Sequence, residues 1–116
     1  MNYLLSRYIY MSTFKSKYNK KYGFPKNESH SVEDISKTSG IKKTILQDVY
    51  DRGIGAWKSN PTSVRSKSGD KKDSGFPLSK RMTKERWAYG RVYGFVMKNP
   101  KQVGEGKPDD DLYKKL

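Results

Sequence analysis

The stretch from Ser31 to Tyr50 constrains the fold of this chain most strongly, because it has the pattern of two short amphipathic helices joined by a glycine. Ser31 can cap the first helix, and Asp34 can return a hydrogen bond to the backbone amide of Ser31. Gly40 allows the chain to turn through a conformation that residues with a Cβ disfavour. The pattern therefore predicts two helices arranged as a helix-turn-helix.

Residues at helical spacing mark the buried and exposed faces of the two predicted helices. The buried side is expected to comprise Val32, Ile35, Ser36 and Ser39 in the first helix, Ile41 between the helices, and Leu46 and Val49 in the second. The polar residues left facing solvent on the second helix are Lys42, Lys43, Thr44, Gln47 and Asp48. This spacing also places Ile45 near the exposed side. Asp48 and Asp51 add negative charge there, which argues against sequence-specific reading of bases.

The exposed lysines belong to a strongly basic chain. Among 116 residues, 25 Lys and Arg against 12 Asp and Glu give a formal net charge of +13. At this charge density the attraction of phosphates alone can drive nucleic-acid binding, and that attraction falls steeply with salt. Solubility, or a surface complementary to acidic proteins, is the other explanation. We expect a nucleic acid as the partner, and double-stranded DNA in the first place.

Length and composition limit the chain to one small domain with a small core. Only 33% of its residues are hydrophobic, and it contains no cysteine that could form a disulfide or a thiolate metal site. The apolar run from Tyr3 to Met11 is interrupted by Arg7 and is too short for a signal peptide or a membrane span. We therefore expect a protein of the host-cell interior or of a virus particle, with no membrane partner.

The chain divides into four predicted segments. They are a basic aromatic arm (1–26), the helix-turn-helix-like core (27–58), a basic polar linker (59–82) and a C-terminal helix with its tail (83–116) that packs with the core. In the arm, Phe14, Tyr18 and Tyr22 are spaced by four and should form a helix face on the core. The lysines and arginines left to bind phosphates in the arm and linker are Lys20, Lys21, Arg65, Lys67, Lys71 and Lys72.

Glycines suggest where helices end or approach one another. Gly53 is placed to end the second helix in a left-handed cap. The last long helix should begin at Thr83 and stop at Asn99, before a proline. Its Gly90 and Gly94, four residues apart, predict a close approach by another helix. Its apolar face is expected to contain Ala88, Val92, Phe95 and Val96.

Catalysis finds little support in the sequence. His30 is the only histidine, and no nucleophile motif accompanies it. The acidic run from Asp109 to Asp111 should cap a short terminal helix rather than bind a metal, because three adjacent carboxylates cannot all point at one ion from a helix. We expect no enzyme, no cofactor, no metal and no small-molecule substrate.

Two resemblances follow from these residues. The stretch from Ser31 to Tyr50 resembles the helix-turn-helix of bacterial repressors of the lactose-repressor type, with matching positions at Ile35, Gly40, Ile41, Leu46 and Val49. Residues 18–23, 39–41, 52–61 and 86–93 resemble a family of small basic proteins of unassigned role, encoded by large double-stranded DNA viruses of algae and by marine phages. This second resemblance spans nearly all of the chain after Met11. It implies a viral source and incorporation into virions, and it brings no established active site.

Two functions from different classes are consistent with these features. The first is a non-enzymatic nucleic-acid-binding protein, in which a groove of the nucleic acid receives the side chains of Lys42, Lys43, Thr44 and Gln47. The second is a minor capsid protein that links neighbouring subunits of a viral shell. The charge and the helix pair favour the first function, whereas the small core and the viral resemblance favour the second.

Overall fold

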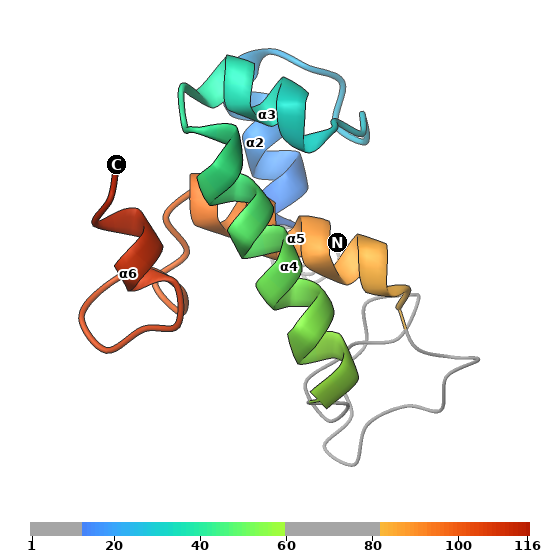
Figure 1. The fold of residues 1–116 in the computed structure, drawn as a ribbon. Helices are drawn as coiled ribbons and strands as arrows, with labels where there is room; N and C mark the ends of the chain where they lie inside the picture. Colours follow the sequence, from blue (N-terminus) through green and yellow to red (C-terminus); the bar gives the residue numbers. More distant parts are fainter. Residues whose placement is uncertain (1–12, 60–81) are drawn as a thin grey trace, which may run out of the picture.

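The computed structural model describes residues 13–59 and 82–116, and this part of the chain is helical. Its helices are α2 (Phe14–Tyr22), α3 (Val32–Ser39), α4 (Lys43–Ser59), α5 (Lys84–Val96) and α6 (Asp110–Tyr113) (Figure 1). No strand occurs among these residues, so the predicted all-α class is confirmed. None of the described helices is long and apolar enough to cross a bilayer.

The second half of the predicted N-terminal arm forms helix α2, which packs against the core. Tyr18 is fully buried, and its ring centroid lies 5.2 Å from that of Tyr93 in α5. Phe14 and Tyr22 are partly buried against the same core, so the predicted aromatic face is confirmed. The helix ends at Gly23, whose φ of 77° suits glycine.

The predicted helix pair is present as α3 and α4. The hydroxyl of Ser31 accepts a hydrogen bond of 3.1 Å from the backbone N–H of Asp34 and so caps α3. Gly40 follows α3 with a φ of 78°, the left-handed conformation that the sequence predicted for the turn. Leu46 and Val49 are fully buried on the core side of α4.

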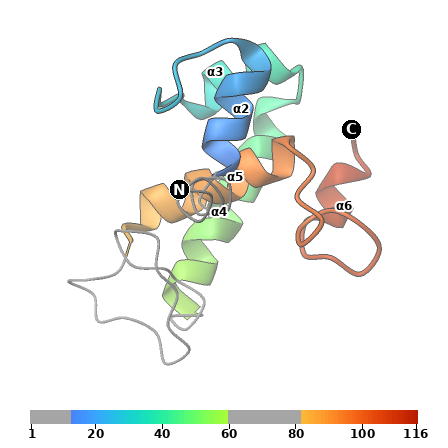
Figure 2. The same ribbon diagram turned by 180° about the vertical axis from the view of Figure 1, so that it is seen from behind.

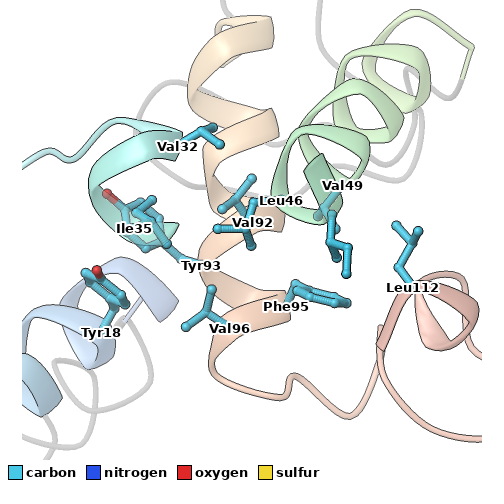
Figure 3. Close-up of a cluster of buried hydrophobic side chains, with 11 residues drawn as sticks. Tyr18, Val32, Ile35, Leu46, Val49, Val92, Tyr93, Phe95, Val96 and Leu112 are labelled. Atoms are coloured by element: carbon cyan, nitrogen blue, oxygen red, sulfur yellow. The ribbon is translucent and has the colours of Figure 1, made fainter. Parts of the chain in front are cut away.

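The buried face of α4 is wider than predicted. Ile45 was expected near the exposed side, but it is buried with only 7% of its surface accessible. The prediction failed because both α3 and α5 pack against α4, and two neighbours cover a broader stripe than one. Figure 3 shows most of this core, which consists of Tyr18, Val32, Ile35, Ile45, Leu46, Val49, Val92, Tyr93, Phe95, Val96 and Leu112.

Gly53 does not end α4, contrary to the sequence-based prediction. The helix continues to Ser59, and Gly53 is buried where α4 crosses α5 (Figures 1 and 2). A Cβ added at Gly53 would lie 2.7 Å from the Cα and 3.0 Å from the Cβ of Ala88 in α5. The glycine therefore permits the close approach of two helix backbones.

Helix α5 has the predicted apolar face, but its glycines have another role than predicted. The expected residues Ala88, Val92, Phe95 and Val96 are all buried. No described atom lies within 4 Å of a Cβ added at Gly90, and Gly94 is covered by the side chain of Gln102. The close helix approach that was expected at this pair occurs at Gly53 instead.

A tryptophan joins the end of α4 to the start of α5. The indole N–H of Trp57 donates a hydrogen bond of 2.7 Å to the carbonyl oxygen of Met82. This bond holds the end of α4 close to Met82, on the two sides of 60–81, the part of the predicted linker that lies outside the described residues.

Candidate nucleic-acid interface

The four residues predicted to enter a groove lie at the exposed start of α4. Lys42, Lys43, Thr44 and Gln47 are all exposed, whereas Ile45 is buried. Because Lys43, Thr44 and Gln47 follow helical spacing, they share one side of the helix. The structure therefore brings this part of the predicted site together on a single short surface.

Helix α4 begins at Lys43, directly after Lys42. Its first turn contains no acidic residue, as in α2, whereas the first turns of α3, α5 and α6 each contain at least one. Lys42 and Lys43 therefore add positive charge to a helix end that is already positive, because its first amide N–H groups have no helical acceptor. Each such lysine opposes the helix dipole by about 0.3–1 kcal/mol. The arrangement concentrates positive potential at one point on the surface.

Negative charge begins one turn further along the same helix. Asp48 and Asp51 are exposed, and Asp51 accepts a hydrogen bond of 3.1 Å from the side-chain amide of Gln47. An anion is therefore attracted to the first turn of α4 and repelled from its middle. The favourable surface is the N-terminal end of the helix and not its whole length.

The predicted lysines of the arm do not join this surface. Lys20 and Lys21 are exposed on α2. Helix α4 runs in front of α5 in Figure 1, and in the reverse view of Figure 2 α2 is nearer to the viewer than α4 and reaches α5 with its lower end. The two sets of lysines thus belong to different helices. The remaining predicted residues, Arg65, Lys67, Lys71 and Lys72, lie outside the described part of the chain.

His30 is held inside the structure. Its Nε2 lies 2.6 Å from the side-chain oxygen of Asn19, which is itself fully buried. Its ring centroid lies 4.5 Å from that of Phe24, and its backbone N–H donates to the hydroxyl of Tyr93. The same Asn19 amide donates to the carbonyl oxygens of Lys26 and Glu28. These contacts make His30 and Asn19 a buried polar link between α2 and the loop before α3.

The three aspartates of the C-terminal segment separate to different partners. Asp109 is fully buried and accepts hydrogen bonds of 3.0 and 2.7 Å from the guanidinium of Arg91. Asp111 pairs with both terminal nitrogens of Arg52, at 2.8 and 2.7 Å. Asp110 pairs with the ammonium of Lys114 at 3.1 Å. Within residues 13–59 and 82–116 no group of acidic, histidine or cysteine residues is arranged to hold a metal ion.

This ionic cluster also corrects the expected cap of α6. Asp109 stands at the N-cap position, but its side chain makes no capping hydrogen bond because it points to the arginines. Burial raises the pKa of Asp109, but hydrogen bonds from Arg91 and Gln102 and the charges of Arg91 and Arg52 outweigh burial, so the pKa is lowered overall. Hydrogen bonds from Arg52 lower the pKa of Asp111 to about 2. The cluster fastens the C-terminal segment to α4 and α5.

Sequence reasoning missed this cluster because its members are far apart in the chain. Arg52 and Asp109 are separated by 57 residues and Arg91 and Asp109 by 18. No local spacing marks such pairs in a single sequence. Arg52 and Arg91, which contribute to the net positive charge, are therefore paired with carboxylates of the same chain.

Comparison with known proteins gives a family but no function. A search of curated proteins found no match, and a search of solved structures found none either. Residues 7–113 match a family described as "Family of unknown function (DUF5824)". Because the match covers most of the chain, this protein belongs to the DUF5824 family.

Proposed function

We propose that this protein is a non-enzymatic, virus-encoded, virion-associated protein that binds double-stranded DNA through the N-terminal end of α4. The observation that carries the proposal is the exposed start of this helix, which has Lys42 and Lys43 and no acidic residue in its first turn. A helix N-terminus with adjacent cations attracts phosphate groups. The net charge of +13 supports a polyanionic partner.

The side chains at this end have different parts in the proposed contact. Lys42 and Lys43 contact phosphates, while Thr44 and Gln47, which face the same way, reach toward base edges. Gln47 must first release its exposed hydrogen bond to Asp51. Because the carboxylates of Asp48 and Asp51 repel phosphates, the helix approaches DNA with its first turn leading. We therefore expect modest sequence preference.

The lysines of α2 contribute in another way. Lys20 and Lys21 lie in the last turn of α2, a different helix from α4, so they attract the polyanion over a distance or contact a second stretch of it. The basic residues between 60 and 81, namely Arg65, Lys67, Lys71 and Lys72, are proposed as further phosphate contacts.

The affinity of the full chain for duplex DNA, measured against salt concentration, tests the proposal. The logarithm of the binding constant should fall linearly with the logarithm of salt, with a slope of about −0.9 for each phosphate neutralised. Absence of binding even at low salt would leave the alternative, a minor capsid protein that links neighbouring shell subunits. Locating the protein in purified particles, either in the shell or with the genome, separates these two functions.

A further inference from the structure

A hollow lies where the start of α2 meets the loop that follows α5. Its volume is about 540 Å³, and it is lined by Phe14, Lys17, Met97, Lys98, Asn99, Pro100 and Lys101. The hollow is open to solvent on one side, so it would enclose a ligand only in part. Three of the lining residues are lysines and none is acidic, so the hollow favours an anion.

The lysines of the hollow keep their charge available. None of the ion pairs in the described part of the chain involves Lys17, Lys98 or Lys101. By contrast, Arg91 is bound to a buried carboxylate. The three ammonium groups therefore have no carboxylate partner among the described residues.

Lys98 adopts a backbone conformation that normally selects glycine. Its φ is 57°, and it is the one non-glycine residue with positive φ in the described part of the chain. The N–H of Lys98 donates to the carbonyl of Phe95, and the N–H of Asn99 donates to the carbonyl of Gly94. These two bonds form a Schellman motif with Lys98 at the position where glycine is most common. A lysine at this position costs stability, and such strain is often found at functional sites.

The loop that presents Lys98 and Lys101 is firmly anchored. The side chain of Asn99 accepts a hydrogen bond from the backbone N–H of Lys101 and donates one of 3.0 Å to Gln102. Gln102 in turn donates to the carbonyl of Arg91 and to the carboxylate of Asp109, each at 2.9 Å. The ionic cluster that holds the C-terminal segment thus also holds this loop, which reduces the ordering cost of binding a ligand.

Apolar and aromatic groups complete the hollow. Phe14 is partly buried in its wall, and the ammonium of Lys17 lies 4.8 Å from the centroid of the Phe14 ring. Met97 and Pro100 add apolar surface on the opposite element. Ammonium groups bind phosphate, and a ring beside them can stack on a planar base. A nucleotide has both of these chemical parts.

We propose that this hollow binds a nucleotide, with its base against Phe14 and its phosphate held by Lys17, by Lys101 and by Lys98, whose ammonium turns to it from the ring of Tyr113, 6.0 Å away in this structure. The nucleotide is either a free mononucleotide or the phosphorylated end of a single strand, which present the same chemistry. This site goes beyond the proposed function, because none of its residues belongs to α4. The nucleotide-binding proposal can therefore be correct or wrong independently of duplex-DNA binding through α4.

Backbone amide chemical shifts of the full chain, measured by NMR during titration, test the proposal. The probes are inorganic phosphate, thymidine monophosphate, and a short thymidylate strand with and without a terminal phosphate. Saturable shifts centred on Phe14, Lys17 and 98–101 with the monophosphate identify a free nucleotide as the ligand. Shifts only with the phosphorylated strand identify a strand end. The proposal is overturned if shifts are confined to α4, or if neither the monophosphate nor the phosphorylated strand shifts the amides of the hollow.

Lys98→Gly separates binding from folding. Glycine relieves the positive φ of residue 98, so this variant should melt about 2–4 °C higher than the parent. Loss of one of three ammonium groups should weaken nucleotide binding about tenfold. Lys17→Gln should weaken it similarly, while Lys58→Gln, at the far end of α4, should bind like the parent. A Lys98→Gly variant that is stable and binds with parental affinity overturns the site.

Discussion

Replacing Gly53 with alanine tests whether the crossing of α4 and α5 is as close as described. The added Cβ would lie 2.7 Å from the Cα and 3.0 Å from the Cβ of Ala88, whereas ordinary contacts are 3.4–4 Å. The nearest obstacle is backbone, which cannot rotate away as a flexible side chain can. The two helices must therefore separate by about 1 Å, which loosens the packing on both sides of the crossing.

The magnitude follows from two opposing effects. Alanine in place of glycine inside a helix stabilises it by about 1 kcal/mol. Overpacking a close interface costs about 1–3 kcal/mol. We expect Gly53→Ala to lower the free energy of unfolding by up to about 2 kcal/mol. Gly55→Ala, in the same helix, is the matched control, because no described atom lies within 4 Å of a Cβ there. It should stabilise the protein by up to about 1 kcal/mol.

Urea denaturation of the parent and both variants measures these differences. Because both substitutions share the same gain in helix propensity, the gap between the two variants isolates the cost of packing against Ala88. We expect a gap of about 1–3 kcal/mol, with Gly53→Ala the less stable. Two variants of equal stability, both above the parent, would show that α4 and α5 do not approach closely at Gly53.

Three further predictions concern the turn and the ionic cluster. Gly40→Val should lower stability by about 1–3 kcal/mol in thermal melting because its φ is 78°, while Gly40→Asn, which tolerates this conformation, should cost less. Asp109→Asn leaves Arg91 without its buried carboxylate and should cost about 3–5 kcal/mol in urea denaturation, and an unchanged midpoint would contradict the cluster. The pKa of Asp111 is lowered to about 2, so its contribution is present above its ordinary pKa of 3.8 and is lost as pH falls toward 2. The acid-induced loss of stability should therefore be smaller in Asp111→Asn than in the parent.

Sequence reasoning succeeded where the determinants are local. Ser31 and Gly40 mark the start and end of α3 through their own backbone and side-chain chemistry. Leu46 and Val49 repeat at the spacing of one helix face, so their burial was predictable. The exposure of Lys43, and with it the candidate surface on α4, followed from the same helical period.

It failed where a distant partner decides the outcome. A glycine in a helix can end the helix or allow a second helix to approach closely. The close approach at Gly53 depends on Ala88 of α5, which the sequence around Gly53 does not reveal. Ile45 is buried because α4 has two neighbouring helices, a number that spacing within α4 does not reveal. The hollow beside α2 was missed for a similar reason, since Lys17 and Lys98 come together only through the fold.

The duplex-DNA affinity of a variant with Lys42, Lys43 and Gln47 all changed to alanine tests the central claim most directly. Its matched control is Lys107→Ala with Lys115→Ala, which removes the same charge from other exposed positions. We predict that the triple variant melts no lower than the parent, because two lysines that oppose the helix dipole are removed. Its free energy of DNA binding should weaken by about 1–3 kcal/mol for each residue that makes a base contact and by less for each phosphate contact. Its salt slope should fall by about 2, while the control changes less in affinity. A triple variant that binds DNA with the affinity and salt slope of the parent would contradict binding through α4, and its failure to enter virus particles would identify this surface as a link between capsid subunits.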